Sequence, residues 1–217
     1  LKLNGLLVFV DIIIIQPTPM QELGDGSKVL RYPPKNKIIK MKYKDCLKES
    51  MELLSKDDKV LFIGYNVARG SRANGSLVNI STSRCIETPC AENLMAGLSI
   101  GLGFKGFKPV LYFERHDFML NALDALVNHL DKSEQYGKES FRSPMIIRAV
   151  VGGTRPFYPG RQHTQDFTLV FKDLFHFPVY DLHTPGEVIE SYRDVSRFEH
   201  SSLLVEHKDL YELEEVL

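Results

Sequence analysis

The 217-residue sequence lacks the features that mark several protein classes. Its three cysteines are odd in number and have no metal-type spacing, so we expect free thiols and a reducing, cytoplasmic setting. The formal net charge of −1 implies no general attraction to nucleic acid or to an anionic membrane. The longest apolar run, 6–15, contains Asp11 and is about half as long as a membrane span. It also lacks the small-residue cleavage pattern of a signal peptide, so no membrane association is expected.

The apolar fraction of 43% is enough for a buried core, and the length fits one domain with or without an appendage. Residues 1–40 combine a β-branched run at 8–15 with the turn and linker residues of 16–19, 24–26 and 33–34. We therefore expect an arm or linker over 1–40 and one folded domain over 41–217.

From Met41 onward, continuous apolar segments typical of buried strands alternate with segments of helical periodicity. The predicted strands are 59–64, 109–113, 145–151, 178–180 and 203–206, and the predicted helices are 43–55, 89–104, 117–131, 165–173 and 185–197. This order predicts an α/β domain with a doubly wound, mainly parallel sheet that is covered by helices on both faces. In such a fold, ligands are expected at the carboxyl ends of the strands.

The helix predicted over 89–104 begins within the stretch Arg84–Asn93. Thr88 is expected as the N-cap, Pro89 as the first helical residue, and Glu92 in the first turn, where a carboxylate also complements the helix dipole. An apolar stripe is predicted at Leu94, Met95, Leu98 and Leu102. Glycines in the same helix predict close packing against its backbone; they are Gly97, Gly101 and Gly103.

Two loops at strand ends carry side chains that are candidates for catalysis or ligand binding. Phe118 follows one strand and either packs in the core or faces a ligand, and its neighbours Arg115 and His116 are either exposed or face an anionic substrate. His163 lies in a loop after another strand, where a histidine is a better acid–base candidate than usual, although a lone histidine is most often structural. No Ser/His/Asp triad or metal-ligand set is apparent, so no metal site is predicted.

Six stretches in order resemble the pyrimidine-binding domain of the transketolase-like thiamine-diphosphate enzymes, in particular the beta subunits of 2-oxo acid dehydrogenases. They are Ile86–Asn93, Lys108–Val110, Asp124–Asn128, Pro144–Ala149, Gln162–Gln165 and Glu206–Tyr211. The resemblance runs from Met41 to about Leu213.

The resemblance implies roles for individual residues. Glu92 corresponds to the glutamate that hydrogen-bonds N1′ of the cofactor's aminopyrimidine, and Phe118 corresponds to the aromatic residue that stacks on that ring. His163 corresponds to the active-site histidine that acts near the substrate or its acyl carrier. Phe113 is a further predicted cofactor-binding residue, and the predicted substrate contacts are Arg115, His116 and Arg161.

In this family the diphosphate and Mg2+ come from a different domain, usually another polypeptide, and the beta subunit normally carries a second α/β domain. Gly24-Asp25-Gly26 lacks the asparagine of the magnesium motif, so we interpret it as a turn and expect a partner, alpha-like subunit to hold the Mg2+. The predicted function is one half of a split thiamine-diphosphate enzyme, active as an oligomer, that decarboxylates a 2-oxo acid and transfers an acyl or aldehyde group. The alternatives are ketol transfer from a ketose by a split transketolase, and a non-catalytic assembly or regulatory domain. We also expect an open apolar surface around Tyr112, Phe113 and Phe118.

Overall fold

The computed structural model describes residues 21–22, 28–29, 40–137 and 142–217. The chain divides into two units, Leu1–Ile38 and Ile39–Leu217. In the first unit, β1 (Gln21–Glu22) pairs antiparallel with β2 (Lys28–Val29). The strand predicted at 8–15 and the turn predicted at 24–26 lie outside the described residues.

The second unit is built on a six-stranded sheet in the order β5-β4-β6-β7-β9-β8, in which every pairing is parallel. The strands are β4 (Val60–Gly64), β5 (Cys85–Glu87), β6 (Lys108–Phe113), β7 (Ile146–Val151), β8 (Val179–Leu182) and β9 (Ser202–His207). The predicted doubly wound parallel sheet is confirmed. Because β5 and β6 lie on opposite sides of β4, the chain reverses its direction across the sheet there, which is where such folds usually bind ligands.

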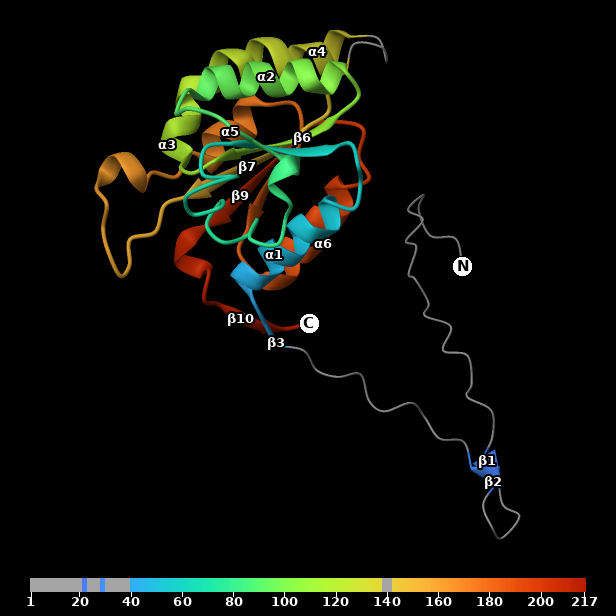
Figure 1. Cartoon of the computed structure of the whole chain (residues 1–217). Helices are drawn as coiled ribbons and strands as arrows, with labels where there is room; N and C mark the ends of the chain where they lie inside the picture. Colours follow the sequence, from blue (N-terminus) through green and yellow to red (C-terminus); the bar gives the residue numbers. More distant parts are fainter. Residues whose placement is uncertain (1–20, 23–27, 30–39, 138–141) are drawn as a thin grey trace, which may run out of the picture. The chain divides into compact units, whose positions relative to one another are not determined.

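Helices cover both faces of this sheet (Figure 1). One apolar core lies under α1 (Tyr43–Leu54) and α6 (Pro185–Val195). The other lies under α2 (Glu92–Phe104), α5 (Thr168–Leu174) and the helical segment 116–136. Alternate residues of β6 enter the two cores, so Tyr112 and Phe113 are both fully buried. The expected open apolar surface around these two residues was therefore wrong, because both faces of the strand are already covered.

The segment 116–136 is not one regular α-helix. It consists of α3 (His116–Met119), a 3-10 turn (Leu120–Ala122), a π-helical stretch (Asp124–Asp131) and α4 (Lys132–Tyr136). Met119, Leu126 and Leu130 lie at helical spacing and are buried, whereas Leu123 is only half-buried. Other 3-10 turns of three residues are η1 (Thr82–Arg84), η5 (Arg161–His163) and η6 (Lys208–Leu210). Within the described residues, no helix is both long and apolar enough to cross a bilayer.

Three strands of the second unit, each of three residues, were not predicted: β5 and the two strands of a small second sheet. β3 (Lys40–Lys42) pairs antiparallel with β10 (Glu214–Val216). The exposed Lys42 and Lys44 both bond to Glu212 beside this pair. The small sheet thus joins the start of α1 to the end of the described chain.

α2 begins three residues later than predicted, at Glu92, and its N-cap is Ala91. The predicted Thr88 cap was wrong because Thr88 still belongs to the β4–β5 pairing, with its amide donating to the Gly64 carbonyl at 2.9 Å, and its hydroxyl oxygen caps no helix amide among the described residues. The predicted apolar stripe was also wrong in part, since Met95 is buried but Leu94 and Leu98 are exposed.

The predicted close packing against the α2 glycines is confirmed for Gly103 alone among the three. A Cβ placed on Gly103 would lie 1.9 Å from the Ser143 hydroxyl oxygen, so no larger residue fits there. A Cβ on Gly97 or Gly101 would meet nothing within 4 Å among the described residues. The prediction was therefore wrong for Gly97 and Gly101 in this chain.

A buried ion pair joins the middle of β7 to β9. Arg148 Nε donates to Glu206 Oε1 at 2.7 Å and Arg148 Nη2 donates to Oε2 at 3.1 Å, with both side chains almost fully buried. The Tyr192 hydroxyl also donates to Glu206 Oε1 at 2.6 Å, and the Arg148 guanidinium lies 5.1 Å from the centre of the Tyr112 ring. Removing either charge would leave the other buried without its partner.

We expect Glu206→Gln to lower the free energy of unfolding by about 3–5 kcal/mol, because it leaves the buried Arg148 charge uncompensated. Chemical denaturation of the full chain measures this loss. Glu212→Gln is the matched control, since it removes an ion pair of exposed side chains and should change stability little. Equal destabilisation by both substitutions would contradict this account of the buried pair.

Candidate functional site

Glu92 is the first residue of α2, directly beyond the loop that leaves β5. Its side chain is buried, with 8% exposure. Within the described residues its carboxylate accepts one side-chain hydrogen bond, a long one of 3.5 Å from Asn121 Nδ2 to Oε2. The carboxylate therefore keeps most of its capacity to accept hydrogen bonds from a ligand.

Tyr65 follows β4, and its hydroxyl is buried without a hydrogen-bond partner among the described residues. Burial raises the pKa of Tyr65, and the negative charges of Glu92 and Glu114 raise it further. The phenol of Tyr65 is therefore protonated at neutral pH and lies within electrostatic range of the Glu92 carboxylate. The sequence analysis missed Tyr65 and Asn121, because their proximity to Glu92 arises only from the fold.

Phe118 and His163 come from separate loops and meet edge to face, with ring centroids 5.3 Å apart and an interplanar angle of 84°. Both are half-buried, and His163 Nδ1 is buried without a partner among the described residues. Asn121, which contacts Glu92, lies three residues after Phe118 on the same helical segment. The fold thus links three residues that the sequence analysis selected separately.

The His163 loop is seated on the end of β7. A Cβ on Gly152 would lie 1.7 Å from the His163 carbonyl oxygen, so this approach requires glycine. Gln165 Nε2 donates to Asp117 Oδ1 at 2.7 Å, which ties the same loop to the segment that carries Phe118. Two independent contacts therefore hold the His163 loop against the strand ends.

Glu87, the last residue of β5, orders the loop that follows β4. Its carboxylate accepts from the Asn66 and Ala68 amides, each at 2.7 Å, although the side chain is not buried. Asn66 Nδ2 in turn donates to Glu114 Oε2 at 3.1 Å beyond β6. These bonds connect the carboxyl ends of three adjacent strands, β5, β4 and β6.

The remaining predicted site residues differ in accessibility. The Phe113 side chain has no exposed surface and belongs to the apolar core. His116 is equally buried; its Nδ1 accepts from the Phe167 amide at 3.2 Å, and burial lowers its pKa to about 4, so its ring is neutral at neutral pH. Arg115 is half-buried, with a buried Nε that has no partner among the described residues, whereas Arg161 is exposed.

No family model matches the chain, but sequence relatives and structural neighbours do. It is 32% identical over 157 residues to the mitochondrial pyruvate dehydrogenase E1 component subunit beta of Saccharomyces cerevisiae, covering 70% of this chain and 42% of that protein. It is 29% identical over 136 residues to the pyruvate dehydrogenase E1 component subunit beta of Rickettsia conorii, covering 60% of this chain and 41% of that protein. It is 25% identical over 178 residues to the 2-oxoisovalerate dehydrogenase subunit beta of Bacillus subtilis, covering 80% and 54%.

The chain therefore spans about half the length, or less, of these relatives. Among solved structures, a split gene transketolase described as an inactive beta4 tetramer matches with a TM-score of 0.59 at 15% identity, over 76% of this chain and 51% of that one. A 2-oxoglutarate:ferredoxin oxidoreductase from Magnetococcus marinus matches with a TM-score of 0.55 at 14% identity, over 84% and 32%. At these identities the structural likeness shows the fold alone. The chain is thus a sequence relative of the pyruvate and 2-oxoisovalerate dehydrogenase beta subunits, and it shares its α/β fold with part of the split gene transketolase structure.

Proposed function

We propose that this chain is the pyrimidine-binding half of a split thiamine-diphosphate enzyme that decarboxylates a 2-oxo acid and transfers the resulting acyl or aldehyde group. The observation that carries the proposal is the buried Glu92 carboxylate at the start of α2, with unused acceptor capacity. Further support comes from the Phe118–His163 ring pair, which is linked to Glu92 through Asn121, and from the sequence similarity to two kinds of beta subunit.

The residues fit the aminopyrimidine end of this cofactor. The Glu92 carboxylate would accept a hydrogen bond from the protonated ring nitrogen and share its proton, since its only side-chain donor among the described residues lies at 3.5 Å. The half-buried Phe118 would provide an apolar face for the ring. When bound, thiamine diphosphate supplies a nucleophilic carbon that adds to the substrate carbonyl and an electron sink for the bond that breaks.

His163 would hold or move a proton near the substrate. Its Nδ1 is buried without a partner among the described residues, which leaves that atom available to a ligand. Arg161, exposed two residues earlier, is the proposed contact for a substrate carboxylate. For Arg115 and the buried His116 a substrate contact stays a prediction, and Phe113 would support the cofactor site from within the core.

A partner, alpha-like subunit would supply the Mg2+ and the diphosphate contacts, and the working enzyme would be an oligomer. The support is chemical, because the candidate site offers one free carboxylate and aromatic surface, whereas a Mg2+–diphosphate group needs several oxygen ligands and backbone donors. All three cysteines are free, which agrees with the proposed reducing, cytoplasmic location.

A 2-oxo acid is favoured over a ketose because the sequence relatives named above are pyruvate and 2-oxoisovalerate dehydrogenase beta subunits. Ketol transfer has only the fold likeness to a split transketolase in its favour. The remaining alternative is a non-catalytic assembly or regulatory domain of the same fold. The effects of the variants described below on catalysis distinguish such a domain from an enzyme.

Glu92→Gln should leave the fold intact and nearly abolish exchange of the cofactor's C2 proton in the complex with the copurifying partner. A neutral amide cannot share the ring-nitrogen proton as the carboxylate does. Proton exchange followed by NMR measures the effect. Glu190→Gln, on the exposed side of α6, is the control and should exchange normally. Normal exchange in a folded Glu92→Gln complex would remove Glu92 from the mechanism.

His163→Ala should slow turnover by about 10²–10⁴-fold, the range for a lost general acid or base, with little change in cofactor affinity. Steady-state kinetics of the assembled enzyme, with a calorimetric titration of cofactor, measure both quantities. His129→Ala, at an exposed histidine, is the control. If affinity falls strongly while turnover at saturation stays normal, His163 is a binding residue instead.

The chain without a partner should not hold thiamine diphosphate at micromolar concentrations. A stacking face and one hydrogen bond contribute roughly 1–3 kcal/mol, whereas micromolar binding requires about 8 kcal/mol. Calorimetric titration with cofactor and Mg2+ is the measurement. Micromolar binding by the chain alone would mean that it carries its own diphosphate site, and the split-enzyme proposal would be abandoned.

A further inference from the structure

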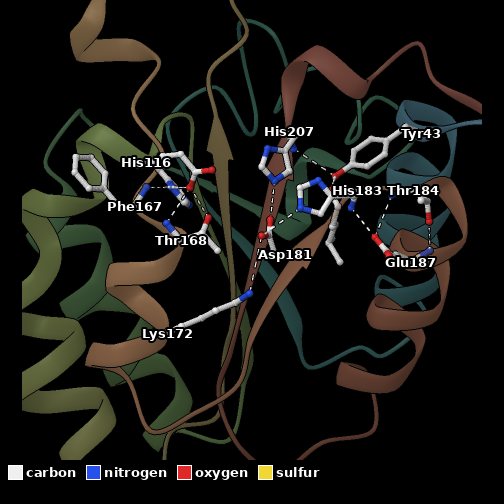
Figure 2. A network of polar contacts seen from close by, with 12 residues as sticks. Tyr43, His116, Phe167, Thr168, Lys172, Asp181, His183, Thr184, Glu187 and His207 are labelled. Carbon is white, nitrogen blue, oxygen red and sulfur yellow. Dashed lines mark hydrogen bonds and ion pairs between the residues drawn. The ribbon is translucent and has the colours of Figure 1, made fainter.

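Two histidines and an aspartate converge at the ends of β8 and β9 (Figure 2). His207 Nε2 lies 2.7 Å from Asp181 Oδ1, and His183 Nε2 lies 3.2 Å from Asp181 Oδ2. The two imidazole rings stack with centroids 4.5 Å apart and an interplanar angle of 22°. Both rings therefore direct the same type of nitrogen toward one carboxylate.

We propose that Asp181, His183 and His207 form a binding site for a divalent first-row transition metal ion such as Zn2+. One ligand atom from each side chain lies within 4.8 Å of the other two. Bonds of about 2.0–2.2 Å to one ion limit any two ligand atoms to roughly 4.4 Å, so the three groups need to close only slightly. Two imidazoles and one carboxylate favour Zn2+ and similar ions over Mg2+ or Ca2+, which prefer oxygen ligands.

The backbone holds this site in place before any ion binds. The Tyr43 hydroxyl donates to the Leu182 carbonyl at 2.9 Å and accepts from the His207 amide at 3.3 Å, which fixes the ends of β8 and β9 together. The His183 amide donates to Glu187 Oε2 at 2.6 Å, and Glu187 also closes the capping box with Thr184 at the start of α6. Preorganised ligands lower the ordering cost of binding.

The side chains leave room for the rearrangement that an ion requires. His183 has 55% of its side chain exposed, so it can turn toward the ion, and solvent can fill the remaining coordination positions. Metal binding requires neutral imidazoles that carry their proton on Nδ1. The Nε2 lone pair of each ring then binds the ion, and the present contact between Nε2 and the Asp181 carboxylate is lost.

The competing explanation is an ion-pair cluster without metal. Lys172 Nζ lies 3.9 Å from Asp181 Oδ2 and already supplies one positive charge, although its side chain is 41% exposed and free to swing into solvent.

Co2+ titration of the tag-free, chelator-treated full chain tests the proposal, because Co2+ bound by nitrogen and oxygen ligands gives visible d–d absorption. We expect one Co2+ per chain, displaced by Zn2+ but not by Mg2+. His183→Ala should weaken binding at least about tenfold, since even residues that only orient metal ligands change affinity by 10–100-fold.

His176→Ala is the matched control. His176 is also exposed and contacts a carboxylate, Asp131 Oδ2 at 3.0 Å, but it has no second histidine beside it among the described residues. Its removal should leave Co2+ affinity unchanged. Asp181→Asn, checked for folding by circular dichroism, should weaken binding as His183→Ala does. Absence of a saturable Co2+ spectrum, or equal affinity in His183→Ala and the unaltered chain, would overturn the proposal.

Discussion

The parallel sheet is covered by helices on both faces, and this constraint decides where polar chemistry can occur. Side chains in the middle of its strands enter one of two apolar cores, as Tyr112 and Phe113 do. The Arg148–Glu206 pair is the exception, and it is tolerated because each charge compensates the other and tyrosines complete the contacts. Charged groups that can still bind a ligand therefore lie at the carboxyl ends of the strands, where the candidate residues are found.

The strand order then places two sets of candidate residues along that edge. The Glu92, Phe118 and His163 residues follow β5, β6 and β7, around the point where the chain reverses direction across the sheet. The Asp181–His183–His207 cluster lies at the ends of β8 and β9, the next strands along the same edge, and His207 pairs directly with Val151 of β7. The two sets of residues are therefore neighbours along one edge of the sheet.

Much of the fold could be predicted from the sequence, because continuous apolar strands and helical periodicity are local signals. The start of α2 could not, since Thr88 satisfies the rules for an N-cap but its amide is taken by pairing with β4. The prediction that Leu94 and Leu98 are buried was wrong because α2 is apolar on most sides, so the periodicity of its apolar residues did not identify the buried face. The three-residue strands β3, β5 and β10 were too short to recognise.

The candidate site could be predicted only as separate pieces. Glu92, Phe118 and His163 were selected from motif resemblance, while the contacts that relate them depend on residues far apart in sequence, such as Asn121 beside Glu92 and Gly152 beneath His163. Asp181 and His207 show the same limit more sharply, because nothing in their sequence spacing suggests a shared ligand. A parallel sheet brings such residues together at strand ends, so a search for function in this fold has to follow strand order as well as sequence spacing.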